Sequence, residues 1–148
     1  MEFITFLHSL LRYAVLIMVA VAGFTALRGY LGRSPVLTWH RSAAIIAMVL
    51  CHIQLVVGII LYANNFGTFE ERFGERPDLM RFWKMEHIAT MILAIALVTM
   101  GRSLSKKAKT EPGKQLRIAV FYLIGLFLML AMIPWPFMAK FSHMYQWI

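Results

Sequence analysis

Apolar residues fill four long runs of the chain, and polar or charged segments separate them. The runs cover residues 4–27, 42–63, 82–101 and 117–138. Each is long enough to cross the hydrocarbon core of a bilayer as a helix of about 20 residues. Because backbone polar groups in lipid must be satisfied within the segment, the pattern predicts an all-α integral membrane protein. We expect one domain, residues 1–148, folded as an up-down four-helix bundle with an uncleaved first span.

The connecting segments differ in charge, and this difference predicts the orientation of the bundle. The cations near the first and third connections are Arg28, Arg33, Arg41, Arg102, Lys106, Lys107, Lys109, Lys114 and Arg117. The second connection, residues 64–80, mixes acids and bases. Lys and Arg accumulate in cytoplasmic loops, so we expect the first and third connections in the cytoplasm. Both termini and residues 64–80 then lie on the outer, periplasmic side of a bacterial inner membrane, and we interpret 64–80 as a solvated connector.

Composition agrees with a multi-pass membrane protein. Hydrophobic residues make up 60% of the chain, and the formal net charge is +8. In a soluble protein such a charge would favour nucleic acid. Here the cations lie between apolar runs, where they meet anionic lipid headgroups, so we expect the lipid bilayer and no nucleic acid as partner. Cys51 is the single cysteine, which excludes an internal disulfide framework.

Titratable residues inside the apolar runs are the candidates for function. His87 follows Glu86 one turn inside the third run, and His52 lies near the middle of the second. In the first run, His8 precedes Arg12 by four residues, a spacing that places both on one helix face. Ionisable groups are costly in a bilayer and usually face a cavity, a partner or a cofactor.

Three histidines on three helices favour a ligand held between helices. The sequence has no C-x-x-C-H motif, which excludes covalent haem, and no metalloprotease or nucleotide-binding motif. A b-type haem held by two imidazoles remains, as does a quinone site that uses one. We favour His52 with His87 as metal ligands, with His8 as a third ligand or, together with Arg12, near the haem propionates. Glu86 completes the predicted cofactor-binding set.

Five sequence blocks resemble the small bacterial four-helix membrane proteins labelled cytochrome B. The blocks are residues 7–13, 51–62, 81–87, 101–103 and 133–137. They follow the same order and cover nearly the whole chain. The resemblance implies a b haem in the cytoplasmic membrane, and by these blocks it would be bound by His8, His52 and His87.

Two functions follow as hypotheses. The first is a membrane b-type cytochrome that moves single electrons between quinol and a partner on the outer side, an electron carrier rather than an enzyme with its own turnover. The second is a non-catalytic subunit of a larger envelope or respiratory complex, in which the histidines are structural. The oligomeric state of the chain is left open. The partner of such a subunit would dock on residues 64–80 and on the aromatic tail around His143, Tyr145 and Trp147. Trp135, between two prolines, is expected to anchor the fourth helix at the headgroups.

Overall fold

The computed structural model describes residues 1–142, which are helical apart from short connections and from residues 133–142, which follow the last helix. Its long helices are α1 (Glu2–Leu31), α2 (Thr38–Asn65), α5 (His87–Lys107) and α6 (Glu111–Met132). All four elements that contain them are long and apolar enough to cross a membrane, which confirms the prediction of four apolar helices of spanning length. The predicted tail with His143, Tyr145 and Trp147 lies outside the described residues.

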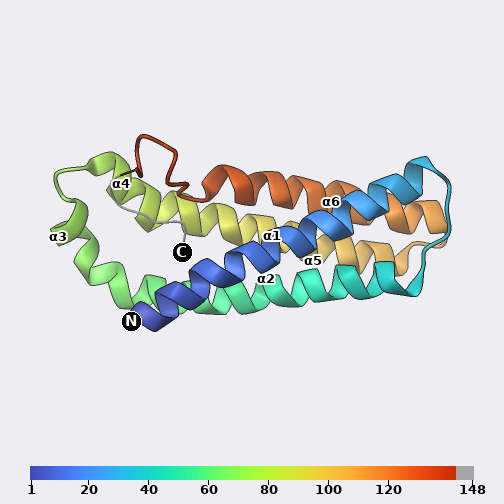
Figure 1. Cartoon of the computed structure of the whole chain (residues 1–148), viewed down its shortest axis with the longest axis horizontal. Helices are drawn as coiled ribbons and strands as arrows, with labels where there is room; N and C mark the ends of the chain where they lie inside the picture. Colours follow the sequence, from blue (N-terminus) through green and yellow to red (C-terminus); the bar gives the residue numbers. More distant parts are fainter. Residues whose placement is uncertain (143–148) are drawn as a thin grey trace.

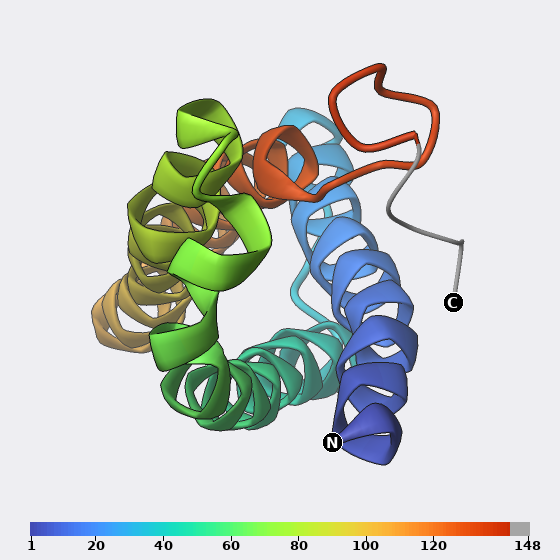
Figure 2. The same ribbon diagram turned by 90° about the vertical axis from the view of Figure 1, so that its left-hand side faces the viewer.

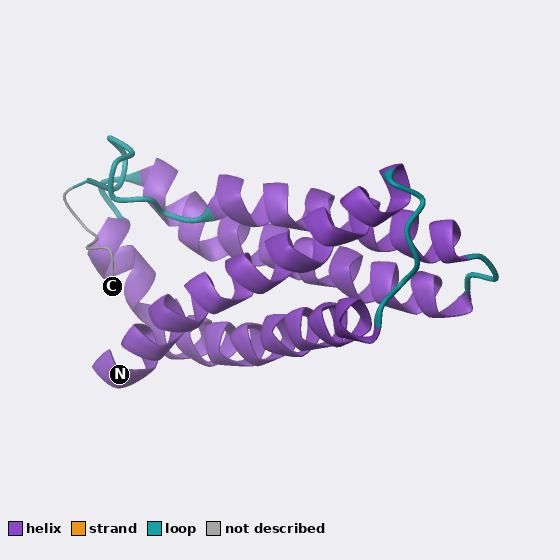
Figure 3. Cartoon of the chain, turned by 45° about the vertical axis from the view of Figure 1, so that its right-hand side comes forward, coloured by secondary structure: helices purple, strands orange, loops and turns teal. Residues whose placement is uncertain are grey.

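The four long helices form a bundle in the cyclic order α1, α2, α5 and α6 (Figures 1 and 2). Neighbours in this order pack against one another, α5 with α6 most extensively and α2 with α5 least. Short loops join α1 to α2 and α5 to α6 at one end (Figure 3). A longer segment joins α2 to α5 at the opposite end, where α1 also begins (Figure 1). The topology is therefore up-down, as predicted.

Small residues allow the close contact between α5 and α6. A methyl group on Gly101 of α5 would lie only 2.6 Å from Cβ of Phe121 on α6. Gly125 of α6 likewise faces the backbone oxygen of Ala94 on α5, at 3.1 Å from the position of its missing Cβ. In lipid, helices associate by close packing rather than by the hydrophobic effect, and glycine gives the shortest approach.

One buried hydrogen bond links α6 to α2 across the bundle. Tyr122 is completely buried, and its hydroxyl donates to the backbone oxygen of Ala44 at 2.6 Å. A buried tyrosine normally finds such a partner because an unpaired hydroxyl is costly away from water. This bond fixes the rotation of α6 relative to α2.

Local sequence explains where α6 begins and ends. Thr110 caps its start, because its Oγ1 accepts the backbone N–H of Gly113 at 3.2 Å. The helix ends at Met132, whereas the apolar pattern predicts a span that reaches residue 138. Ile133 is extended, with φ −77° and ψ 131°. Pro134 imposes this conformation on the residue before it, and so stops the helix early.

Residues 66–86 form a cap of short helices rather than the solvated connector that we expected. They comprise a 3₁₀ turn (Phe66–Thr68), α3 (Phe69–Phe73), α4 (Pro77–Arg81) and a π-helical turn (Phe82–Glu86) that runs into α5. Their buried side chains form one apolar cluster with a residue that follows α6: Phe69, Phe73, Leu79, Phe82 and Phe141. This end of the bundle is therefore covered by packed side chains.

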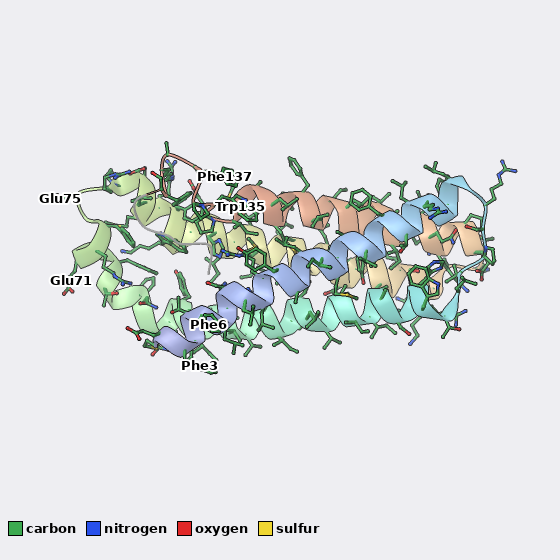
Figure 4. The ribbon with its side chains drawn as sticks, viewed as in Figure 1. Phe3, Phe6, Glu71, Glu75, Trp135 and Phe137 are labelled. Atoms are coloured by element: carbon green, nitrogen blue, oxygen red, sulfur yellow. The ribbon has the colours of Figure 1, made fainter. Side chains whose placement is uncertain are left out.

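Aromatic and acidic side chains project from the same end (Figure 4). Glu71 and Glu75 point away from the bundle, while Phe3 and Phe137 are 73% and 69% exposed. Trp135 lies beside Phe137, with its ring stacked at a centroid distance of 5.7 Å. Exposed aromatic rings beside charged residues are typical of the boundary between lipid tails and headgroups.

Candidate functional site

A cavity of about 890 Å³ opens inside the bundle at the end that α3 covers. Side chains of α1, α2, α5 and α6 line it, and most of them are apolar. The polar side chains among them include His8, Arg12, Gln54 and His87, and Gly58 of α2 also lines the cavity. This volume lies in the upper part of the range for small-molecule and cofactor sites, about 300–1,000 Å³.

His87 is oriented by a backbone oxygen that a proline has left available. In a regular helix, the Met132 oxygen would accept the N–H of residue 136, but Pro136 has no N–H. The Nδ1 of His87 lies 2.8 Å from this oxygen. A carbonyl can only accept, so Nδ1 carries the proton, and the Nε2 of the neutral ring keeps its lone pair. An imidazole held in this way is suited to bind a metal through Nε2.

Pro134 acts on the preceding turn in the same way as Pro136. Pro134 leaves the Leu130 oxygen without its helical donor, and the indole N–H of Trp135 donates to this oxygen at 2.9 Å. Residues 133–137 therefore have a role within the fold in addition to the expected headgroup anchor. They end α6, place Trp135 and leave the Met132 oxygen available to orient His87.

His8 lines the same cavity from α1. Its ring packs on Gly58 of α2: a methyl group on this glycine would lie 3.1 Å from Cε1 of His8 and 3.7 Å from Nδ1. The buried Nδ1 has no hydrogen-bond partner in the described part of the chain. His8 also lies within electrostatic range of His87 and Arg12. The two imidazoles, from α1 and α5, thus share one cavity.

Gln54 connects α2 to α1 beside this ring. Its side-chain N–H donates to the backbone oxygen of His8 at 2.8 Å, while its buried Oε1 has no partner among residues 1–142. An acceptor in this position can receive a hydrogen bond from a ligand in the cavity. Gln54 was not among the predicted site residues, although an amide within an apolar run is itself a signal.

Arg12 brings a positive charge to the cavity wall, as its spacing from His8 predicts. Its Nη2 donates to the Tyr13 hydroxyl at 3.0 Å. Its guanidinium carbon lies 4.7 Å from the centre of the Tyr13 ring and 5.8 Å from that of Trp135. These contacts hold the guanidinium against aromatic faces at the cavity wall.

Two predicted site residues lie elsewhere. His52 is exposed on the outer surface of α2, where its Nδ1 lies 2.7 Å from the Met48 oxygen and its Nε2 3.4 Å from Oγ1 of Thr99. It does not line the cavity. Glu86 accepts a hydrogen bond from Arg81 at 2.6 Å and is also absent from the cavity wall.

The structure therefore brings together His8, Arg12 and His87, but it does not bring His52 to His87, the pair that we favoured. Within residues 1–142, no group of three or more His, Cys, Asp or Glu side chains could hold a metal ion. Any metal in the cavity would thus depend on two imidazoles rather than three. Gln54, two residues after His52, lines the cavity. Two residues along a helix correspond to a rotation of about 200°, so His52 lies on a face of α2 that points away from the cavity.

Comparisons with protein-family models, with curated proteins and with solved structures find no match for this chain. The resemblance to proteins labelled cytochrome B therefore stays a prediction. The functional argument depends on the cavity and on the side chains that line it.

Proposed function

We propose that this protein is a membrane b-type cytochrome whose haem is held in the cavity by His8 and His87. The observation that supports the proposal is that two imidazoles from separate spanning helices line one large, mainly apolar cavity. Reversible one-electron exchange is the chemistry that such a haem supplies. The protein would then carry electrons rather than turn over a substrate of its own.

The two histidines fit this role through their hydrogen bonds. His87 donates from Nδ1 to the Met132 oxygen, and metal-ligating histidines usually make such a bond with the nitrogen that does not bind the metal. The buried Nδ1 of His8 has no partner in the described structure. A buried polar atom left unsatisfied costs about 1–3 kcal/mol, so a ligand bound at this ring would offset that cost.

The remaining walls suit an apolar ligand with acidic groups. Leu55, Met91 and Ile95 line the cavity and give its wall an apolar character. Arg12 lies on the same wall as His8, one turn away, and can pair with a carboxylate of the ligand. An apolar shell and a nearby cation are two of the means by which a protein sets the potential of a haem.

The charge distribution supports the proposed location. The short loops at one end carry the cations that favour the cytoplasmic side, so the cavity would open near the outer side of a bacterial inner membrane. Both chain ends would also lie on that side. Quinol in the bilayer and a protein partner on the outer side are the proposed electron donor and acceptor.

An absorption spectrum tests the haem proposal. Protein purified from haem-replete cells should show a Soret band that shifts on reduction with dithionite. A colourless preparation that also fails to bind added haem would overturn the proposal.

A second function is supported by the position of His52. This imidazole is exposed near the middle of α2, a place where lipid tails would otherwise meet it. A partner helix would cover it if the chain were a subunit of a larger membrane complex. Replacement by leucine, His52→Leu, should then release the partner during purification in mild detergent. If no protein co-purifies with the wild type, this second proposal fails.

A further inference from the structure

All of the formal net charge lies at the end of the bundle opposite the cavity. The nine cations that were assigned to the first and third connections lie here, and Glu111 is the acid among them. At the cavity end, acids and bases balance: Glu2, Glu70, Glu71, Glu75, Asp78 and Glu86 against Arg12, Arg72, Arg76, Arg81, Lys84 and Lys140. The end of the bundle opposite the cavity, hereafter the basic end, is thus complementary to an anionic lipid surface.

Within this basic end, a small cleft of about 30 Å³ lies between the helices. Three cations line it from three helices, namely Arg41 of α2, Arg102 of α5 and Lys114 of α6. Lys114 lies 3.6 Å from a carboxylate oxygen of Glu111, whereas Arg41 and Arg102 form no ion pair within residues 1–142. Glu111 also interacts electrostatically with Arg41, so the three cations outnumber this acid and can attract an external anion.

His40 adds a hydrogen-bond donor to the same cleft. The backbone N–H of Leu37 donates to Nδ1 of His40 at 3.0 Å. Since Nδ1 acts as the acceptor, the proton of the neutral ring lies on Nε2. The ring therefore presents an N–H group, like the arginines, and favours a group rich in acceptors such as phosphate.

Gln115 offers the cleft a hydrogen-bond acceptor rather than a donor. Its side chain is 3% exposed, and its N–H group donates to the Ser34 oxygen at 3.0 Å. Its buried Oε1 has no partner in the described part of the chain, and the residue lines the cleft. An occupant that offers a donor to Gln115 as well as acceptors to the cations would satisfy both. A free volume of this size holds one small group, such as a hydroxyl.

We propose that this cleft binds the headgroup of an anionic phospholipid of the phosphatidylglycerol type. Its phosphate lies between Arg41, Arg102 and Lys114, and a glycerol hydroxyl enters the cleft and donates to Oε1 of Gln115. The occupant is a lipid rather than a soluble phosphate, because the cleft lies at the end of an apolar bundle where acyl chains can follow the helix surfaces. This site does not depend on the haem proposal.

The experiment uses native mass spectrometry to compare how much phosphatidylglycerol is retained by the wild type and by its variants. Each protein is purified in nanodiscs of phosphatidylcholine doped with phosphatidylglycerol. The double variant Arg41→Gln with Arg102→Gln should retain at least about tenfold less phosphatidylglycerol than wild type. The matched control, Lys106→Gln with Lys107→Gln, removes the same charge from exposed positions at the same end but outside the cleft. It should retain phosphatidylglycerol within about threefold of the wild-type level.

Equal losses in the two double variants would overturn the proposal, because they would show a diffuse charge effect. Displacement of the lipid by glycerol 3-phosphate alone would also overturn it in favour of a soluble ligand. Phosphatidic acid, which lacks the hydroxyl, should bind more weakly than phosphatidylglycerol, and the isosteric variant Gln115→Met should abolish this preference. If the arginine double variant fails to fold, the exposed single variant Arg41→Gln provides the same comparison against Lys106→Gln.

Discussion

Gly58 provides a direct test of where the His8 ring lies. The missing Cβ of Gly58 would lie 3.1 Å from Cε1 of His8, about 0.5 Å closer than an ordinary contact between carbon atoms. The variant Gly58→Val adds this carbon and two further methyl groups. We expect the free energy of unfolding to fall by about 1–3 kcal/mol, the usual cost of inserting carbon atoms into a packed interior.

The assay is unfolding of the ligand-free protein in mixed micelles, followed by far-ultraviolet circular dichroism. Gly67→Val serves as the matched control, because no heavy atom lies within 4 Å of its missing Cβ and neither glycine has a positive φ. Its free energy of unfolding should change by less than about 0.5 kcal/mol.

A double-mutant cycle completes this test. If the His8 ring is the obstacle, the variant His8→Ala should relieve the cost of Gly58→Val, with a coupling energy of about 1 kcal/mol or more. Additive effects, within about 0.5 kcal/mol, would show that the ring does not pack on Gly58. The position of His8 in the cavity would then have to be abandoned.

Two further predictions concern the packing of the bundle. Tyr122→Phe should lower the free energy of unfolding by about 0.5–1.5 kcal/mol, because it removes the buried hydrogen bond to Ala44. The control variant Tyr30→Phe should change the free energy of unfolding by less than about 0.5 kcal/mol. Equal effects of the two variants in the same assay would contradict the role of the Tyr122 hydroxyl. Gly101→Val should cost about 1–3 kcal/mol or more, since even its Cβ would overlap Phe121. A Gly101 variant as stable as wild type would show that α5 and α6 are not in close contact.

The four spanning helices could be predicted from the sequence because lipid demands long apolar segments. The rotation of each helix could not be read from hydrophobicity, because α2 is apolar on the face toward lipid and on the face toward the bundle. Ile53 and Val56 are exposed, and Ala47 and Cys51 are completely buried. Residue size carries the missing information, since small residues gather where membrane helices pack closely.

A stripe of small residues on α2 would have identified the correct face. The buried residues Ala44, Ala47 and Cys51 recur at helical spacing, and the same face continues through Gln54 to Gly58. His52 lies off this stripe, which is why the pair of His52 with His87 is not formed. The sequence alone did not fix the rotation of α2 about its axis, which decides whether His52 or Gln54 faces the cavity.

The role of residues 133–137 depended on tertiary contacts that no local rule supplies. Two prolines predict a disrupted helix end, and the sequence shows which backbone oxygens lose their donors. It does not show that the Met132 oxygen would meet the ring of His87 from another helix. The cap at residues 66–86 was easier to predict from the sequence, because Phe69 and Phe73 have the spacing of one helix face.

The most direct test of the central claim is the reduced-minus-oxidised spectrum of four proteins after titration with haem: wild type, His8→Ala, His87→Ala and His52→Ala. Circular dichroism should first show that all four are folded. The account predicts that wild type and His52→Ala give the same low-spin spectrum, while the His8 and His87 variants each lose it. Loss of this spectrum in His52→Ala, with His8→Ala unchanged, would contradict the proposal that His8 and His87 share one ligand.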